Sequence, residues 1–151
     1  LGDVYKRQGQ NAGKDDLIRS GNQHSALDRK TILVVEDISS NYLLISAMLS
    51  KHYNLLHAVN GEQAVAMVKE YKIDLLLMDM KMPVMDGLTA TAEIRKFDTN
   101  IPIVALTAHA FESDKVAALK SGCNDYLVKP VDKARLMSVL RKYCHPSTLV
   151  L

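Results

Sequence analysis

The sequence predicts an α/β fold, a doubly wound sheet of five parallel strands with helices on both faces. Three observations predict it. From Thr31 onward, short apolar runs alternate with stretches of helical spacing. Several of these runs are apolar throughout, as strands that are buried on both faces require. The chain has 151 residues, 48% of them hydrophobic, which suits one compact domain with a core.

The predicted strands are the apolar runs Ile32–Val35, Leu55–Val59, Leu75–Met78, Ile103–Leu106 and Tyr126–Val128. Between and after them, apolar residues recur with helical spacing at Ala64, Val65 and Val68 and at Leu136, Val139, Leu140 and Tyr143. We expect Ser39 or Ser40 to cap the first helix and Asp86 to cap the third. Gly122 fits the end of the fourth helix.

The two ends of the chain are predicted to lie outside the domain, which is assigned to residues 30–145. Residues 1–29 are rich in Gly, Asn, Gln, Ser and charge, which is typical of a linker or a disordered tail. Within them, residues 3–8, DVYKRQ, resemble the translation of a sequencing-library adapter, which favours an adapter scar outside the fold. Residues 146–151 are predicted to be a short C-terminal tail, which is too short for an effector domain.

Charge and composition argue against nucleic-acid and membrane binding. Residues 1–30 hold six Lys and Arg against four Asp and Glu, while residues 31–151 hold thirteen of each. Aromatic residues are sparse, and no segment has the length of a membrane span. Cys123 and Cys144 lack metal-ligand spacing and are predicted to be reduced structural thiols. A soluble cytoplasmic domain is expected.

Polar residues stand where four of the predicted strands end: Glu36, Asp37, Asp79, Thr107 and Lys129. The carboxyl ends of parallel strands share one edge of the sheet, where open α/β folds build their sites. In the flavodoxin-like strand order 2-1-3-4-5, strands one and three are neighbours, so Asp37 would lie beside Asp79. Each residue alone is commonly a cap, a turn residue or a solvated charge, but five together at one edge indicate a site.

Converging carboxylates repel one another unless a cation compensates. Oxygen ligands select Mg²⁺, or a similar ion such as Mn²⁺, rather than zinc. Lys129 can add a fixed ammonium and Thr107 a hydroxyl donor. A carboxylate nucleophile, a metal, an ammonium and a hydroxyl are the groups that phosphoryl transfer uses. The sequence therefore predicts a phosphoryl site, without a glycine-rich nucleotide loop.

Four segments together resemble one family: ILVVED, LLLMDMKMPVMDG, IPIVALTA and DYLVKP, in this order, are similar to the receiver domain of two-component response regulators. The resemblance covers residues 31–143. The segments MPVMDG, TAHAF and SGCNDYLVKP are most similar to receivers that are attached to hybrid sensor histidine kinases. The resemblance implies a phospho-accepting domain that catalyses its own aspartyl phosphorylation and dephosphorylation rather than the turnover of a substrate.

The resemblance also implies the role of each acidic residue. Asp79 matches the aspartate that takes a phosphoryl group from a phosphohistidine. Asp37 matches the direct Mg²⁺ ligand, and Glu36 beside it would act through water. Asp79 and the backbone carbonyl of Lys81 would complete the protein ligands.

Thr107, Lys129 and Tyr126 match the residues that convert phosphorylation into a conformational change. Thr107 corresponds to the switch hydroxyl that follows the phosphoryl group, and Lys129 to the lysine that pairs with it. Tyr126 corresponds to the aromatic residue whose rotation reports to the face of helix four, strand five and helix five.

The resemblance assigns loop-shaping roles to Pro83, Gly87 and Pro130, the last preceded by a cis bond. The methionines around Asp79 are interpreted as packing residues. Lys81 and His109 occupy positions that vary in the family, and His109 is expected to be an exposed loop residue.

The implied partner is a histidine phosphotransfer protein or a histidine kinase domain. The parent chain would be a hybrid kinase, which can itself be membrane-anchored, or a stand-alone regulator. One alternative is an aspartate-nucleophile phosphatase, which generally needs an acid where Lys81 stands. The others are an interaction module that signals without phosphorylation, and a flavin or nucleotide binder.

Overall fold

The computed structural model describes residues 28–145, which form one parallel sheet in the order β2-β1-β3-β4-β5. The strands are β1 (Thr31–Val35), β2 (Asn54–Ala58), β3 (Leu75–Asp79), β4 (Ile103–Thr107) and β5 (Asp125–Val128). The helices are α2 (Ser39–Leu49), α3 (Gly61–Glu70), α4 (Gly87–Arg95), α5 (Glu112–Ser121) and α6 (Lys133–Cys144). The predicted fold class and strand order are confirmed. Both predicted tails, except residues 28 and 29, lie outside the described residues.

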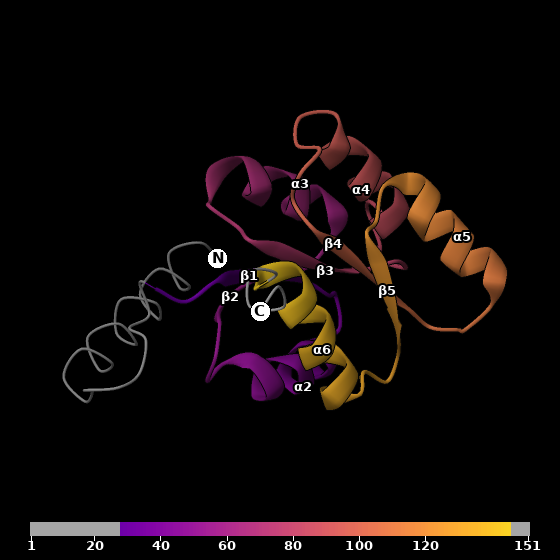
Figure 1. The fold of residues 1–151 in the computed structure, drawn as a ribbon. Helices are drawn as coiled ribbons and strands as arrows, with labels where there is room; N and C mark the ends of the chain where they lie inside the picture. The colour runs from indigo at the N-terminus through magenta and orange to yellow at the C-terminus, as the bar shows by residue number, and fades with distance from the viewer. Residues whose placement is uncertain (1–27, 146–151) are drawn as a thin grey trace, which may run out of the picture.

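Helices cover the two faces of the sheet in three layers (Figure 1). One core cluster joins the sheet to α3, α4 and α5, and the other joins it to α2 and α6. Successive residues of β3 show why its apolar run is uninterrupted. Leu76 and Met78 belong to the first cluster, Leu75 and Leu77 to the second, and all four side chains are fully buried.

Two of the three predicted helix ends are confirmed. The Asp86 carboxylate accepts the Thr89 N–H at 2.8 Å, and Gly122 ends α5 with a left-handed φ of 116°. The predicted cap of the first helix is wrong. α2 begins at Ser39, after Ile38, and no side chain of the described residues caps it. The backbone N–H of Ile38 instead donates to the Glu36 carboxylate at 3.2 Å, so the acidic loop organises this turn.

The strands extend one residue beyond the prediction at β3 and β4, which changes where the site residues lie. Asp79 is the last residue of β3 and pairs with Leu106, and Thr107 is the last residue of β4 and pairs with Val128. The backbone of both residues is therefore fixed by the hydrogen bonds of the sheet rather than lying in a loop. Asp79 is 4% exposed and Thr107 is 3% exposed.

Both cysteines are free and buried, as predicted. Burial raises the pKa of the Cys144 thiol to about 11 and also raises the pKa of Cys123. Among the described residues, 28–145, no helix is both long enough and apolar enough to cross a membrane.

Candidate functional site

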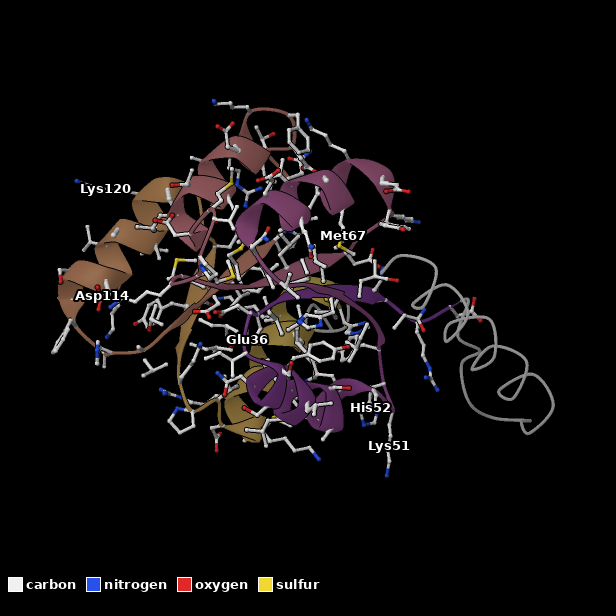
Figure 2. The ribbon with its side chains drawn as sticks, turned by 180° about the vertical axis from the view of Figure 1, so that it is seen from behind. Glu36, Lys51, His52, Met67, Asp114 and Lys120 are labelled. Carbon is white, nitrogen blue, oxygen red and sulfur yellow. The ribbon has the colours of Figure 1, made fainter. Side chains whose placement is uncertain are left out.

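Three carboxylates meet at the carboxyl edge of the sheet. One oxygen each from Glu36, Asp37 and Asp79 lies within 4.8 Å of the others. The topology explains this meeting, because β1 and β3 are neighbours and Val35 pairs with Met78 just before the acids. Glu36 is fully buried and lies near the middle of the molecule (Figure 2). The sequence prediction that Asp37 lies beside Asp79 is confirmed.

Lys129 bridges two of these acids. Its Nζ lies 3.0 Å from Glu36 Oε1 and 3.0 Å from Asp79 Oδ2, and the side chain is 23% exposed. The backbone holds the lysine in place: its N–H donates to the Thr107 carbonyl at 2.8 Å, and the Lys129–Pro130 bond is cis, as the resemblance implied. The site therefore contains one fixed ammonium among three carboxylates.

The pKa directions follow from burial and from these contacts. Burial raises the pKa of Glu36, the hydrogen bond from Lys129 partly offsets this, and the charge of Asp79 raises it further. Burial alone would lower the pKa of Lys129, but hydrogen bonds to Asp79 and Glu36 outweigh it, so the pKa is raised. Lys129 stays charged, and its single positive charge lies among three acidic side chains.

One buried oxygen of the cluster lacks a hydrogen-bond partner in the part of the chain that the structure describes. Asp37 Oδ1 is buried and has no partner among the described part of the chain, 28–145. A buried polar atom without a partner is costly, and in native proteins it commonly marks a missing water or ion. An all-oxygen donor set next to this atom fits a hard divalent cation such as Mg²⁺.

The loop between β3 and α4 is packed tightly against Asp79. The Lys81 N–H donates to Asp79 Oδ1 at 3.3 Å, and the Gly87 N–H donates to the Met80 carbonyl at 3.1 Å. A Cβ at Gly87 would lie 2.2 Å from the carbonyl oxygen of Asp79, so only glycine fits there. Pro83 lies exposed in the turn between Met80 and Gly87.

The predicted switch residues lie on the next two strands, Thr107 at the end of β4 and Tyr126 within β5, and they are held by other contacts. The Thr107 hydroxyl donates to the backbone carbonyl of His109 at 3.0 Å, and His109 is exposed as expected. Tyr126 on β5 pairs with Ala105, and its ring is partly buried. Lys115 Nζ of α5 lies 5.0 Å from the centre of that ring.

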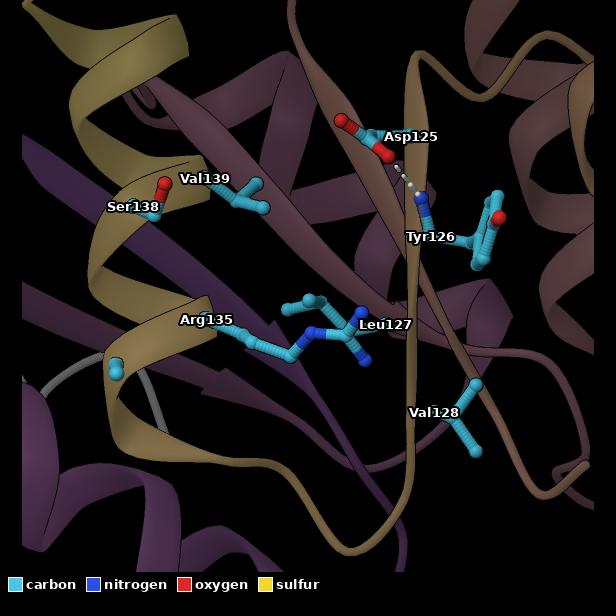
Figure 3. Close-up of a pocket in the computed structure, with 8 residues that line it drawn as sticks. Asp125, Tyr126, Leu127, Val128, Arg135, Ser138 and Val139 are labelled. Atoms are coloured by element: carbon cyan, nitrogen blue, oxygen red, sulfur yellow. Dashed lines mark hydrogen bonds between the residues drawn. The ribbon is translucent and has the colours of Figure 1, made fainter. Parts of the chain in front are cut away.

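Two hollows lie near these residues. One of about 390 Å³ lies between β5 and α6, and its lining does not include Glu36, Asp37 or Asp79 (Figure 3). In this view the Tyr126 ring points away from α6, while the Arg135 side chain reaches toward β5. A smaller one of about 80 Å³ lies beside the site and includes Glu36, Lys129 and residues of α2.

The sequence placed Lys129 near the acids as a further positive charge, but it did not predict the direct ion pair of Lys129 with Glu36. Nor did it predict the contact from His57 on β2, whose Nε2 lies 2.8 Å from the Glu36 backbone carbonyl oxygen. A single histidine within a short strand gives no sequence signal of such a contact.

A protein-family model described as the response regulator receiver domain matches residues 32–141. Among curated proteins, hybrid signal transduction histidine kinase M of Dictyostelium discoideum is 41% identical over 119 residues, 74% of this chain. The sensor histidine kinase GacS of Pseudomonas protegens is 41% identical over 118 residues, also 74% of this chain. The chain spans only 5% and 13% of the lengths of these two relatives.

Two solved structures are similar over most of their own length. One is the receiver domain of the Saccharomyces cerevisiae response regulator Ssk1, crystallised with the histidine phosphotransfer protein Ypd1; the TM-score is 0.73 at 36% identity, covering 76% of this chain and 88% of that one. The other is the receiver domain of a sensor histidine kinase from Pseudomonas aeruginosa, with a magnesium ion in its active-site cleft. Its TM-score is 0.72 at 40% identity, covering 76% of this chain and 97% of that one.

Proposed function

The chain belongs to the response regulator receiver family of two-component and phosphorelay signalling, and on that premise we propose that Asp79 is its phosphoacceptor. The observation that carries the proposal is the position of the Asp79 carboxylate at a buried strand end, where it lies 3.0 Å from Lys129 Nζ and has an oxygen within 4.8 Å of oxygens of Glu36 and Asp37. Strands are rigid supports, so the carboxylate is presented in a fixed direction.

The phosphoryl group would come from a phosphohistidine. An Asp79 oxygen attacks the phosphorus, the phosphorus–nitrogen bond breaks, and the histidine leaves with the electron pair of that bond. Glu36, Asp37 and the backbone carbonyl of Lys81 are proposed to hold Mg²⁺ or Mn²⁺ together with Asp79. The ion supplies positive charge to the phosphoryl oxygens when bound. Lys129 stands 3.0 Å from Asp79 Oδ2, within reach of the same oxygens.

Thr107 and Tyr126 are proposed to carry the response. The phosphoryl group carries about two negative charges in place of the single charge of the carboxylate, and it brings hydrogen-bond acceptors next to Thr107. The Thr107 hydroxyl then exchanges the His109 carbonyl for a phosphoryl oxygen. Tyr126 moves toward the space that this exchange opens and alters the face formed by α5, β5 and α6. Reversing a 99:1 population in this way takes about 5.5 kcal/mol.

The proposed partner is a histidine phosphotransfer protein or the histidine domain of a kinase. Support comes from the similar receiver that was crystallised with a phosphotransfer protein, and from the hybrid kinases among the relatives. We place the domain in the cytoplasm, as part of a hybrid kinase. A stand-alone regulator is the second placement.

The test is intact mass spectrometry after incubation with acetyl phosphate and Mg²⁺. Wild type should gain the mass of one phosphoryl group, and Asp79→Asn should gain none, because an amide does not form the acyl phosphate. Chelating the metal should also prevent the adduct. Asp114→Asn makes the same chemical change on α5 and should behave as wild type. Circular dichroism checks that both variants are folded.

An adduct on folded Asp79→Asn would show that the nucleophile is another residue. If Mg²⁺ binds but no adduct forms with any phosphodonor, including a phosphorylated histidine phosphotransfer protein, the chain would be an interaction module. Steady release of phosphate from a phosphomonoester would favour the phosphatase alternative.

A further inference from the structure

We propose that His57, on the edge strand β2, is a positioning residue for the metal-binding acids Glu36 and Asp37. The inference rests on the proposed function, because it concerns how strongly that site binds Mg²⁺. His57 does not itself belong to the acidic cluster. It acts on the backbone that carries the cluster.

The contact is a hydrogen bond from the imidazole to the acidic loop. His57 Nε2 lies 2.8 Å from the Glu36 carbonyl oxygen, and since a carbonyl only accepts, Nε2 carries the proton and donates. Ala58, the next residue of β2, holds the backbone N–H of Glu36, which donates to the Ala58 carbonyl at 3.0 Å. Two consecutive residues of β2 thus hold both backbone polar groups of Glu36.

The imidazole is itself held in place. Its ring stacks on Tyr42 of α2, with 3.8 Å between the ring centres and 8° between the planes. Both side chains are partly buried, and His57 pairs with Val34 in the parallel ladder. The donor therefore has a fixed position between the sheet and α2, and it points at the end of β1.

The Glu36 carbonyl matters because it belongs to the peptide plane that joins Glu36 to Asp37. Rotation of this plane would redirect the Asp37 backbone and with it the carboxylate whose Oδ1 is buried without a hydrogen-bond partner among residues 28–145. A bond that fixes the plane aims Asp37 at the cluster before the ion arrives. Residues behind metal ligands typically change metal affinity 10- to 100-fold when they are lost.

The experiment measures Mg²⁺ affinity by isothermal titration calorimetry and stability by urea unfolding in a chelator. His57→Phe keeps a ring to stack on Tyr42 but removes the donor, and we expect about 10-fold weaker Mg²⁺ binding. His57→Gln restores an N–H near the Nε2 position and should recover most of the affinity. His57→Asn is too short to do so. His52→Phe makes the same change on an exposed histidine after the far end of α2 and should match wild type (Figure 2).

Unchanged Mg²⁺ affinity in a folded His57→Phe would overturn the inference, even if stability falls, because it would show a packing role alone. If His57→Phe does not fold, the Gln and Asn variants decide, and equal affinities in these two would also overturn it. A wild-type protein that binds no Mg²⁺ would instead contradict the proposed function itself.

Discussion

The acid side of the site and its switch side share one edge of the sheet but are held by different kinds of contact. The acid side comprises Glu36, Asp37, Asp79 and Lys129, and the switch side comprises Thr107, His109, Lys115 and Tyr126. On the acid side, buried charges pair at 3.0 Å. On the switch side, one hydroxyl bonds to an exposed loop, and an ammonium lies 5.0 Å from the centre of a half-buried ring.

This difference suits two tasks. Buried charge pairs are costly to break, so the acid side would keep its geometry through the proposed phosphorylation of Asp79. Contacts with exposed backbone and with partly exposed rings cost little to exchange, so the switch side can have two arrangements. Substitutions that alter one side at a time can separate these two kinds of contact.

Gly87→Ala should damage the acid side most. The new Cβ would lie 2.2 Å from the Asp79 carbonyl oxygen, which belongs to the backbone of a central strand and cannot easily move. We expect a loss of about 2–3 kcal/mol in the free energy of unfolding, and loss of phosphorylation because Asp79 is displaced. Urea unfolding and intact mass measure the two effects. Thr89→Ala, on the same helix, is the control, and equal stability of the two variants would contradict the packing argument.

Lys129→Met should destabilise the acid side by removing a charge while keeping a side chain of similar length. The thioether keeps the chain length but leaves Glu36 and Asp79 without their ammonium, which should cost about 2 kcal/mol when no metal is bound. Mg²⁺ should then restore more stability to the variant than to wild type, because it replaces the missing charge. Urea unfolding with and without Mg²⁺ measures this.

The control for Lys129→Met is Lys142→Met. Lys142 pairs with Asp125 at 3.7 Å, but its side chain is 63% exposed. We expect a change within about 0.5 kcal/mol, since exposed ion pairs contribute little. If the two substitutions had equal effects, burial would not distinguish the acid side.

Thr107→Val should affect the switch side and spare the acids. Loss of the hydroxyl bond to the His109 carbonyl should cost about 1 kcal/mol. Mg²⁺ affinity and the phosphorylated fraction should remain near wild type, while the response of Tyr126 to phosphorylation is lost. NMR spectra with and without phosphodonor report that response. Thr107→Ser keeps the hydroxyl and should restore it; a full response in Thr107→Val would remove Thr107 from the switch.

The sequence predicted the elements that follow from local pattern and from strand order. Uninterrupted apolar runs identified the buried strands, and once the order 2-1-3-4-5 was assumed, the meeting of Asp37 and Asp79 followed. What it missed depends on tertiary geometry. The bond from His57 to Glu36 joins residues 21 positions apart through a side chain and a backbone carbonyl, which no residue pattern records. The prediction that Ser39 or Ser40 caps α2 was wrong because the Glu36 carboxylate holds the turn before this helix.

The smallest effect is expected from Lys115→Ala. The ammonium lies 5.0 Å from the centre of the Tyr126 ring, and such contacts contribute about 0.5 kcal/mol where water reaches them. Removing it should hardly change stability but should free the ring, so that NMR signals of Tyr126 shift toward their phosphorylated positions before any phosphodonor is added. Lys120→Ala, an exposed lysine on the same helix, should leave these signals unchanged. If the two variants gave the same spectrum, the Lys115 contact would not hold the Tyr126 ring. The resting arrangement of the switch side would then depend on the hydrogen bond of Thr107 alone.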